Sequence, residues 1–322
     1  MNTNPLVSIV CLTYNEVQFV RDCFDSFLSQ KTNFPFEVLV YDDASVDGTQ
    51  DIILEYASKY PGVFKPTLYK ENNFSKGLGF YGLRVGFSEA RGKYIAYCEG
   101  DDYWCDSNKL QKQVDYLESN LECEVCAHET KIRNDEDSKE DGVLFTHTKV
   151  NIFLDRTKQD CFSFEDTLTG NIFHISSMMF RNSAPIKWPD WICEVKALDM
   201  VLFMLLAERG DIYLMRDVMS VYRHNQKSIT STQTEFFNQV AFNNASMDIL
   251  EKMDEYWEGK YHKEISKVES RYYVNNMFCY LSKSMRDFEM AKIMAKKARM
   301  YDMKTFWKYL FVESWEKLKK HL

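Results

Sequence analysis

The sequence predicts an α/β fold in which a mostly parallel sheet with flanking helices is followed by a helical C-terminal extension. Two observations lead to this expectation. Short apolar runs alternate with helical patterns through roughly the first 120 residues, and from about residue 232 onward only helical periodicity remains. Strands that alternate with helices indicate βαβ units, whose parallel sheet is covered on both faces. The turns after the strands then lie along one edge, where ligands bind in such sheets.

The alternating elements follow one another in order. Apolar runs predict strands at residues 6–12, 36–41, 63–69 and 94–98. Between them, apolar residues that recur every three or four positions predict helices around 20–28, 52–57 and 83–90. Further on we expect a charged, solvated loop at 134–141, a strand at 171–181, a helix around 198–206 and late strands at 212–215 and 218–222. A boundary at 228 then separates a domain of residues 1–228 from a helical region of residues 229–322.

Charge and composition limit the function. The chain has 322 residues, an apolar fraction of 45% and a net charge of −8. Such a balance argues against a general nucleic-acid binder, which normally shows a basic face. The charge is uneven, because Lys and Arg number 23 against 35 acids in residues 1–225 but 17 against 13 in residues 226–322.

The start of the chain and its cysteines predict a cytoplasmic protein. Residues 1–5 lack the basic start and apolar stretch of a signal peptide, and no run approaches the roughly 20 apolar residues of a membrane span. Nine cysteines without a framework suit a reducing compartment. Cys123 and Cys126 form a lone CxxC, for which ordinary burial is favoured over a redox or zinc role.

Acidic residues gather where the fourth predicted strand ends, in Cys98-Glu99-Gly100-Asp101-Asp102-Tyr103-Trp104. Neighbouring carboxylates repel one another and resist desolvation. A hard divalent cation relieves this, since it prefers oxygen ligands and often holds substrate phosphates. The cluster is therefore the first candidate for a functional site.

The other strand ends carry polar residues but no phosphate loop. Thr13-Tyr14-Asn15-Glu16 follows the first strand and contains neither the glycine fingerprint of a dinucleotide-binding domain nor a GxxxxGK[ST] sequence. Tyr14 can stack on a flat base and Asn15 can donate and accept, although a plain polar turn is the alternative.

After the second strand, Asp43 can accept a hydrogen bond from a nucleobase, whereas Asp47 and Thr49 are read as helix caps. The Asp47-Gly48-Thr49 sequence superficially matches a dehalogenase-type phosphatase motif. Ser45 stands where that motif needs its nucleophilic aspartate, so this reading fails.

Taken in order, these pieces resemble the family 2 glycosyltransferases with a GT-A fold, a Rossmann-like architecture. The resemblance rests on four pieces: residues 7–16, residues 41–49, the DxD-like Glu99-Gly100-Asp101, and Ala197-Leu198-Asp199 at the head of a later helix. It extends through Val221-Tyr222-Arg223-His224. It covers roughly the first 225 residues. Each piece alone is weak, but four in the right order and spacing form a specific signal.

The resemblance implies a nucleotide-sugar donor and a divalent cation, Mn²⁺ or Mg²⁺. For the donor, it implies a pocket lined by Thr13, Tyr14, Asn15 and Glu16, a base read by Asp43 (most often uracil), and a covering loop that contains Lys76 and Gly77.

For the acid cluster, the resemblance implies that Asp101 is the principal metal ligand, that Glu99 contacts ribose or metal, and that Asp102 orients the sugar. It also implies that His224 reaches the metal or a phosphate.

The same resemblance makes Asp199 the catalytic base. A carboxylate opposite the leaving group takes the proton of the acceptor hydroxyl, and such a single displacement inverts the anomeric configuration. Helix capping is the alternative role for Asp199. On the acceptor side, Trp104, Trp188 and Trp191 can stack on sugar rings and His174 lies in a segment similar to the family's acceptor segment, with core packing as the alternative.

The last residues pose a separate question. One helical face carries large apolar residues, with lysines elsewhere: Met303, Phe306, Trp307, Leu310, Phe311, Trp315, Leu318 and Leu322. This pattern fits a helix lying on anionic lipid, and it equally fits packing on the catalytic domain or on a second subunit.

The sequence thus predicts a cytoplasmic, metal-dependent, inverting glycosyltransferase that adds a sugar, from a UDP-sugar by preference, to a cell-surface polysaccharide or lipid-linked glycan. Peripheral contact with the inner face of the membrane through 303–322 is part of this expectation. The alternative is a catalytically silent sugar-binding or scaffolding protein of the same fold. A sugar-nucleotidyltransferase would need a basic, glycine-rich loop after the first strand, which Thr13-Tyr14-Asn15 does not provide.

Overall fold

The computed structural model describes residues 4–134, 141–148, 153–195, 197–223, 237–282 and 285–319. It divides into two compact units, one formed by residues up to 167 with 171–226 and the other by 168–170 with 227–322. The predicted boundary at 228 and all but the two end residues of the predicted loop at 134–141 lie outside the described residues.

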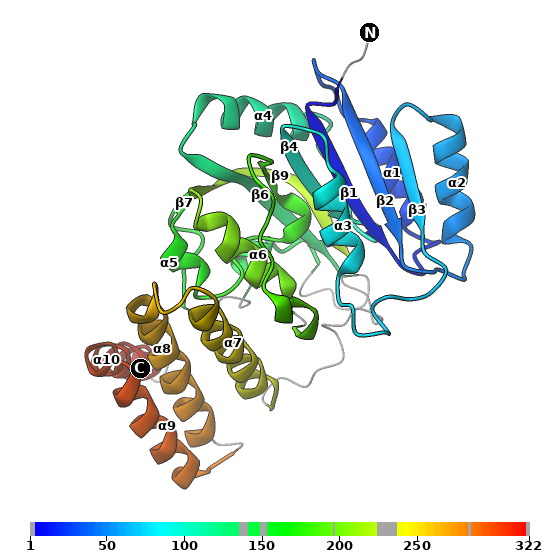
Figure 1. Ribbon diagram of the computed structural model, residues 1–322. Helices are drawn as coiled ribbons and strands as arrows, with labels where there is room; N and C mark the ends of the chain where they lie inside the picture. Colours follow the sequence, from blue (N-terminus) through cyan, green and yellow to red (C-terminus); the bar gives the residue numbers. More distant parts are fainter. Residues whose placement is uncertain are drawn as a thin grey trace. The chain divides into compact units, whose positions relative to one another are not determined.

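The first unit is built on a single mixed, mostly parallel sheet, as the sequence predicts (Figure 1). Its strand order is β3-β2-β1-β4-β8-β6-β9-β5, with β7 also paired to β9. The strands are β1 (Val7–Thr13), β2 (Phe36–Asp42), β3 (Phe64–Leu68), β4 (Tyr94–Glu99), β5 (Tyr103–Trp104), β6 (Cys123–Arg133), β7 (Cys161–Phe162), β8 (Met179–Arg181) and β9 (Asp211–Arg223). Strands β1 to β4 run parallel, so their carboxyl ends share one edge.

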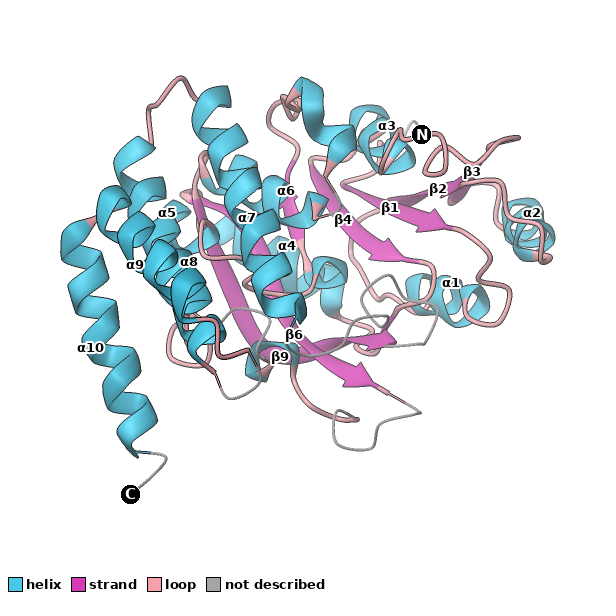
Figure 2. Cartoon of the chain, turned by 90° about the horizontal axis from the view of Figure 1, so that it is seen from below, coloured by secondary structure: helices cyan, strands magenta, loops and turns pink. Residues whose placement is uncertain are grey.

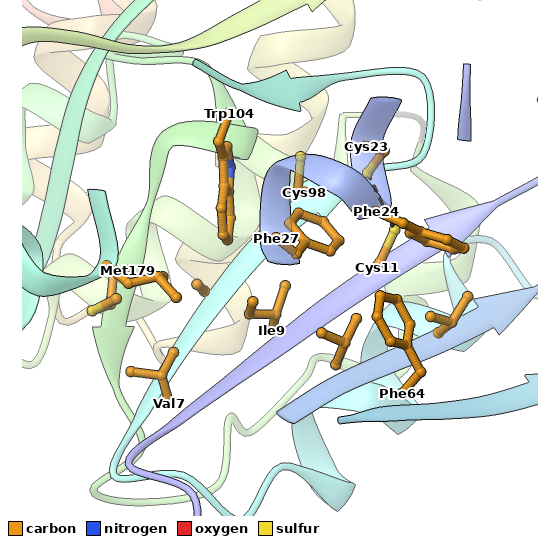
Figure 3. Packing of buried hydrophobic residues seen from close by; sticks show 14 of the residues in the cluster. Val7, Ile9, Cys11, Cys23, Phe24, Phe27, Phe64, Cys98, Trp104 and Met179 are labelled. Atoms are coloured by element: carbon orange, nitrogen blue, oxygen red, sulfur yellow. Dashed lines mark hydrogen bonds between the residues drawn. The ribbon is translucent and has the colours of Figure 1, made fainter. Parts of the chain in front are cut away.

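Helices α1 (Val20–Leu28), α2 (Thr49–Lys59) and α4 (Lys109–Ser119) cover one face of this sheet. Their apolar side chains meet those of β1, β2 and β4 in one core, which Figure 3 shows from Val7 to Phe64 and Trp104. Phe24 packs edge-on against Phe64, with ring centroids 5.0 Å apart. Burial of this face supplies the main driving force for folding the unit.

Helix α3 (Tyr81–Glu89) lies on the opposite face and approaches the sheet closely. A Cβ at Gly86 would come within 2.6 Å of Val10 and 2.8 Å of Tyr41, so only glycine allows this contact. Helix α6 (Leu198–Ala207) also belongs to this unit and is buried on almost every side, which explains its continuous apolar sequence. The short helix α5 (Phe164–Thr167) contacts α6.

Three parts of the sheet differ from the sequence-based expectation. The predicted strand at 171–181 is a strand only in β8, because a 3₁₀ turn occupies Ile175–Ser177. The two late strands are one long strand, β9, with register shifts against β6. Strand β6 was not predicted, since it buries polar residues such as Glu124, His128 and Glu129 and therefore lacks an apolar run. Cys123 and Cys126 lie in this strand as buried free thiols.

The second unit is helical. It contains α7 (Phe237–Tyr256), α8 (His262–Leu281), α9 (Phe288–Tyr301) and α10 (Met303–Lys319), and α8 to α10 pack on one another (Figure 2). Buried amides join two of the helices, because Asn243 Nδ2 donates to Asn276 Oδ1 at 2.7 Å. Across the described helices, none combines the length and the apolar character needed to cross a bilayer.

An ion cluster at the amino-terminal edge of the sheet leads to a first prediction. Glu37 is 2% exposed and accepts from Ser8 Oγ at 2.7 Å, from Lys65 Nζ at 2.9 Å and from the Arg91 guanidinium. Burial alone would raise the pKa of Glu37, but the hydrogen bonds from Arg91, Lys65 and Ser8 lower it to about 2. The folded protein therefore binds fewer protons than the unfolded chain between the ordinary pKa of about 4.5 and about 2.

We expect Glu37→Gln to lower the free energy of unfolding by about 2–3 kcal/mol at neutral pH. The stabilisation is present above the ordinary pKa and is lost as the pH falls, so the gap between variant and wild type should close toward pH 2. Urea unfolding across this range measures it. The matched control is Glu55→Gln, because the ion pair of Glu55 with Arg21 is half-exposed on both sides and its loss should change stability very little. A constant gap at all pH values would contradict the assignment.

Candidate functional site

The loops after β1 and β2 are tied to each other. Asn15 has a left-handed backbone (φ 56°), and its backbone N–H donates to Ser45 Oγ while its Oδ1 accepts from Val46 N–H at 2.9 Å. Thr13 is buried and donates to Asp42 Oδ1. Tyr14 is 49% exposed, so its ring is available to a flat ligand. The turn is thus a fixed polar platform and not a loose connection.

Asp43 holds the loop that follows β3. Its Oδ1 accepts from the backbone N–H of Asn73 at 2.8 Å and from Asn73 Nδ2 at 2.9 Å, and its Oδ2 accepts from Phe74 N–H at 3.0 Å. Asn72 Nδ2 reaches the Asp43 carbonyl oxygen. The carboxylate expected to read a base therefore also anchors the candidate donor loop.

The loop after β3 also contacts the segment that precedes α6. Lys76 pairs with Glu71 on the surface, and Gly77 has a positive φ of 76° with open space around it. Gly79 lies against the backbone of Cys193, where a Cβ would come within 3.2 Å. The loop thereby contacts the 3₁₀ turn Asp190–Glu194.

Four carboxyl groups meet at the ends of β1 and β4. Burial raises the pKa of Glu99 to about 8 and that of Asp101 to about 6, and burial with neighbouring charges raises the pKa of Glu16 and Asp102 well above the usual range. The charges of both Asp101 and Asp199 contribute to the raised pKa of Glu99. These carboxylates consequently share one electrostatic region, although they come from distant parts of the chain.

Asp102 is fully buried and has fixed partners. Its Oδ2 accepts from Ser176 Oγ, and its Oδ1 accepts from the backbone N–H of Arg223 at 3.1 Å. His174 Nδ1 lies 3.6 Å from Asp102 Oδ2, and burial lowers the pKa of His174 to about 3, so the ring is neutral. The His174 ring stacks on Tyr222 at 4.3 Å between centroids.

Asp199 lies in the first turn of α6. Its Oδ1 accepts from the backbone N–H of Met200 at 2.9 Å, and its Oδ2 accepts from Asn171 Nδ2. Burial raises the pKa of Asp199, while the hydrogen bond from Asn171 opposes the rise. The backbone of Asn171 is held by Arg156, whose buried guanidinium donates to the carbonyl oxygens of Asn171, Ile172 and Phe145.

The residues present fit a divalent cation. Glu16 Oε2 is a buried carboxylate oxygen without a hydrogen-bond partner, and the pKa of its carboxyl is raised by burial and by Asp101. Within the described residues, ligand atoms of Glu99, Asp102 and His174 lie within 4.8 Å of one another. Carboxylate oxygens with a neutral imidazole suit Mn²⁺ or Mg²⁺. Asp101, the expected principal ligand, lies in the same carboxylate cluster but not in that group of three.

The candidate acceptor tryptophans differ in burial and in the residues they pack on. Trp104 is 3% exposed, donates from Nε1 to the Ser176 carbonyl oxygen and packs on Phe27 at 4.7 Å between ring centroids. Trp188 is half-buried and stacks on Phe87, and Trp191 is half-buried in the 3₁₀ turn at 190–194. The prediction for His224 falls outside the described residues.

Sequence reasoning gave no role to Arg223, which closes one side of the acid cluster. Its Nη1 donates to the Asp101 carbonyl oxygen at 2.8 Å, its Nη2 binds Asp22, and its guanidinium lies over the Tyr103 ring at 4.5 Å. Arg223 lies 122 residues from Asp101 in sequence. The signal available was its place beside His224 in the late segment 221–224.

This arrangement of sheet, loops and acids defines the GT-A class of fold. TarS of S. aureus, solved with UDP-GlcNAc, is similar with a TM-score of 0.55 over 93% of this chain and 89% of that one, at 14% identity. A mannosyltransferase of Pyrobaculum calidifontis, PcManGT, solved with GDP-Man and Mn²⁺, is similar with a TM-score of 0.57 over 98% and 81%, at 15% identity.

The chain belongs to glycosyl transferase family 2, whose model matches residues 8–182. Rv1520 of Mycobacterium tuberculosis, an uncharacterised protein, is 35% identical over 69% of this chain. That match spans 60% of the mycobacterial protein's own length. TuaG of Bacillus subtilis, which is named for teichuronic acid biosynthesis, is 30% identical over 36% of this chain and 43% of its own.

A prediction follows from the crowding at Gly100. A Cβ there would come within 2.1 Å of Glu16 Oε2 and 2.7 Å of Thr13 Cγ2. We expect Gly100→Ala to displace Glu16 and to cost about 1–3 kcal/mol of stability, measured by urea unfolding. Gly62→Ala is the matched control, because nothing lies within 4 Å of its Cβ position. Equal effects of the two substitutions would contradict the close packing of β1 and β4 at this edge.

Proposed function

We propose that this protein is a metal-dependent, inverting glycosyltransferase that moves a sugar from a nucleotide-sugar donor to a hydroxyl of a glycan. One observation carries the proposal. The charges of both Asp101 and Asp199 contribute to the raised pKa of Glu99, which supports the proposal that the cation ligand and the base lie in one region.

The donor is proposed to lie across the ends of β1 and β2, with UDP as the preferred nucleotide. In favour of this, Tyr14 is exposed, and the Oδ2 of Asp43 accepts one hydrogen bond and keeps a lone pair for a base N–H. Thr13 and Asn15 shape the turn, Glu16 and Glu99 face the acid cluster, and Lys76 and Gly77 lie on the loop that Asp43 anchors. The UDP-GlcNAc in TarS and the GDP-Man in PcManGT indicate which nucleotides to compare.

In the proposed reaction, Asp199 accepts the proton of the attacking hydroxyl, and its hydrogen bonds to Asn171 and Met200 keep the carboxylate oriented. Asp101, with Glu99 and the oxygen of Glu16, would hold Mn²⁺ or Mg²⁺, and His224 is a further proposed ligand. The cation supplies charge neutralisation for the departing diphosphate. Asp102 is proposed to orient the donor sugar, and hydrogen bonds from Ser176 and Arg223 hold both of its carboxylate oxygens in place.

The acceptor is proposed to be a cell-surface polysaccharide or a lipid-linked glycan, built at the cytoplasmic side of the membrane. The name of TuaG supports this class of acceptor. Trp188 and Trp191, half-buried near the turn that precedes α6, are the proposed acceptor contacts with His174. Trp104 is more simply a core residue that supports the Ser176 carbonyl.

The test compares UDP-, GDP- and dTDP-sugars by thermal shift with and without Mn²⁺, followed by donor hydrolysis with the sugar that binds. A ligand of the native state raises the melting temperature. Binding with Mn²⁺-dependent hydrolysis supports the enzyme. Binding without any turnover supports the alternative, a silent sugar-binding protein of the same fold.

A further inference from the structure

Exposed apolar side chains gather at the start of α10 in the helical unit. Met303 is 60% exposed, Trp307 48% and Phe311 72%. These residues lie four positions apart, so they form one stripe along the helix. Met300, at the end of α9, is 74% exposed. Large apolar side chains exposed in a row mark a surface that contacts something apolar.

Lysines accompany this stripe. Lys304 and Lys308 are exposed and form a second row, which lies about 100° around α10 from the row of Met303 and Trp307 and borders it. On α9, Lys292 and Lys296 are likewise exposed. Residues 288–311 contain six Lys and Arg against two acids, in a chain whose net charge is −8. The stripe is therefore both apolar and locally basic.

The stripe is distinct from the face that α10 uses for packing. Phe306 is 4% exposed, and the Arg299 guanidinium lies over its ring at 5.6 Å. Figure 2 shows α10 beside α9. The sequence pattern placed 303, 306, 307, 310 and 311 on one face. The structure separates them, because Phe306 is buried while Met303, Trp307 and Phe311 are exposed.

We propose that the stripe Met303, Trp307 and Phe311, with Lys304 and Lys308, binds the surface of a membrane rich in anionic phospholipid. Tryptophan favours the bilayer interface, and phenylalanine and methionine enter the adjoining acyl-chain region. The ammonium groups of the lysines reach the lipid phosphates. Since no described helix can span a bilayer, the contact is peripheral. This surface lies outside the residues proposed for glycosyl transfer, so either proposal can fail alone.

A second copy of this chain is the less favoured occupant. A twofold interface presents the same patch from both copies, so Lys304 and Lys308 of one copy would face those of the other. Like charges brought together in this way oppose association. An anionic surface instead complements every lysine around the stripe.

The test is flotation of the full chain with vesicles of phosphatidylcholine alone and with vesicles of phosphatidylcholine and phosphatidylglycerol in equal parts. We expect binding to the second kind only, decreasing as salt is added. Lys304→Gln combined with Lys308→Gln should weaken it about 30-fold, at roughly one charge contact each. Trp307→Ser combined with Phe311→Ser should abolish it.

The matched control is Leu121→Ser, which removes an apolar side chain of similar exposure (76%) from the first unit and should bind as wild type does. Unchanged melting temperatures establish that the variants fold. Vesicle binding that survives Trp307→Ser with Phe311→Ser would overturn the proposal. Absence of vesicle binding by the wild type would also overturn the proposal. This holds even if light scattering shows a dimer that Trp307→Ser with Phe311→Ser dissociates.

Discussion

Asp199→Asn should lower the rate of sugar transfer by about 10²–10⁴-fold, the usual contribution of a positioned general base. The substitution keeps the size of the side chain, and Asn171 can turn its amide to accept from the new side-chain N–H₂. The hydrogen bond to Met200 N–H is kept by the remaining carbonyl oxygen. The change therefore removes the base while leaving the first turn of α6 in place.

The measurement is kcat for transfer and for donor hydrolysis, together with donor affinity by calorimetry. We expect kcat to fall and donor affinity to stay within about twofold, since Asp199 is proposed to face the acceptor. Asp190→Asn is the control, because it removes an exposed carboxylate from the 3₁₀ turn shortly before Asp199. An equal loss in both variants, or a full rate in Asp199→Asn, would remove Asp199 from the reaction.

Asp101→Asn should make the protein more stable and much less active. Without a cation, the Asp101 charge raises the pKa of both Glu16 and Glu99, so these groups repel one another in the folded state. Neutralising Asp101 relieves part of this repulsion, and we expect the melting temperature to rise by about 2–4 °C, which is roughly 1 kcal/mol.

The same substitution should abolish the stabilisation by Mn²⁺ and lower transfer about 1,000-fold, the equivalent of several kcal/mol of charge stabilisation. Asp115→Asn makes the same change in net charge on an exposed part of α4 and should alter neither property. A variant that is less stable than wild type without metal, and that still responds to Mn²⁺, would show that Asp101 is a structural residue.

The fold was predictable to the extent that strands were apolar. Strands β1 to β4 appear in the sequence because both faces of each are covered, which requires continuous apolar runs. Strand β6 is equally central, yet it buries Glu129 and Thr130. Their partners, Arg216 for Glu129 and Ser220 for Thr130, lie about 90 residues away, so no local pattern announces them.

The candidate site divides in the same way. The grouping of Glu16 with Glu99 and Asp101 follows from the parallel pairing of β1 with β4, because both loops then emerge at one edge. The contacts of Asn171 with Asp199 and of Ser176 and Arg223 with Asp102 depend on tertiary packing that the spacing of residues does not encode. The proposed roles of all these residues stay predictions until the variants are measured.

The hydrogen bonds that Asp43 accepts from Asn73 and Phe74 have a consequence for the proposed choice of sugar nucleotide. Exchanging the aspartate alone would release three hydrogen bonds and free the segment that is proposed to cover the donor. Grafting a different segment alone would leave a carboxylate without its amide donors. Redesign of nucleotide preference, in the laboratory or in natural divergence, must therefore exchange both pieces as one unit.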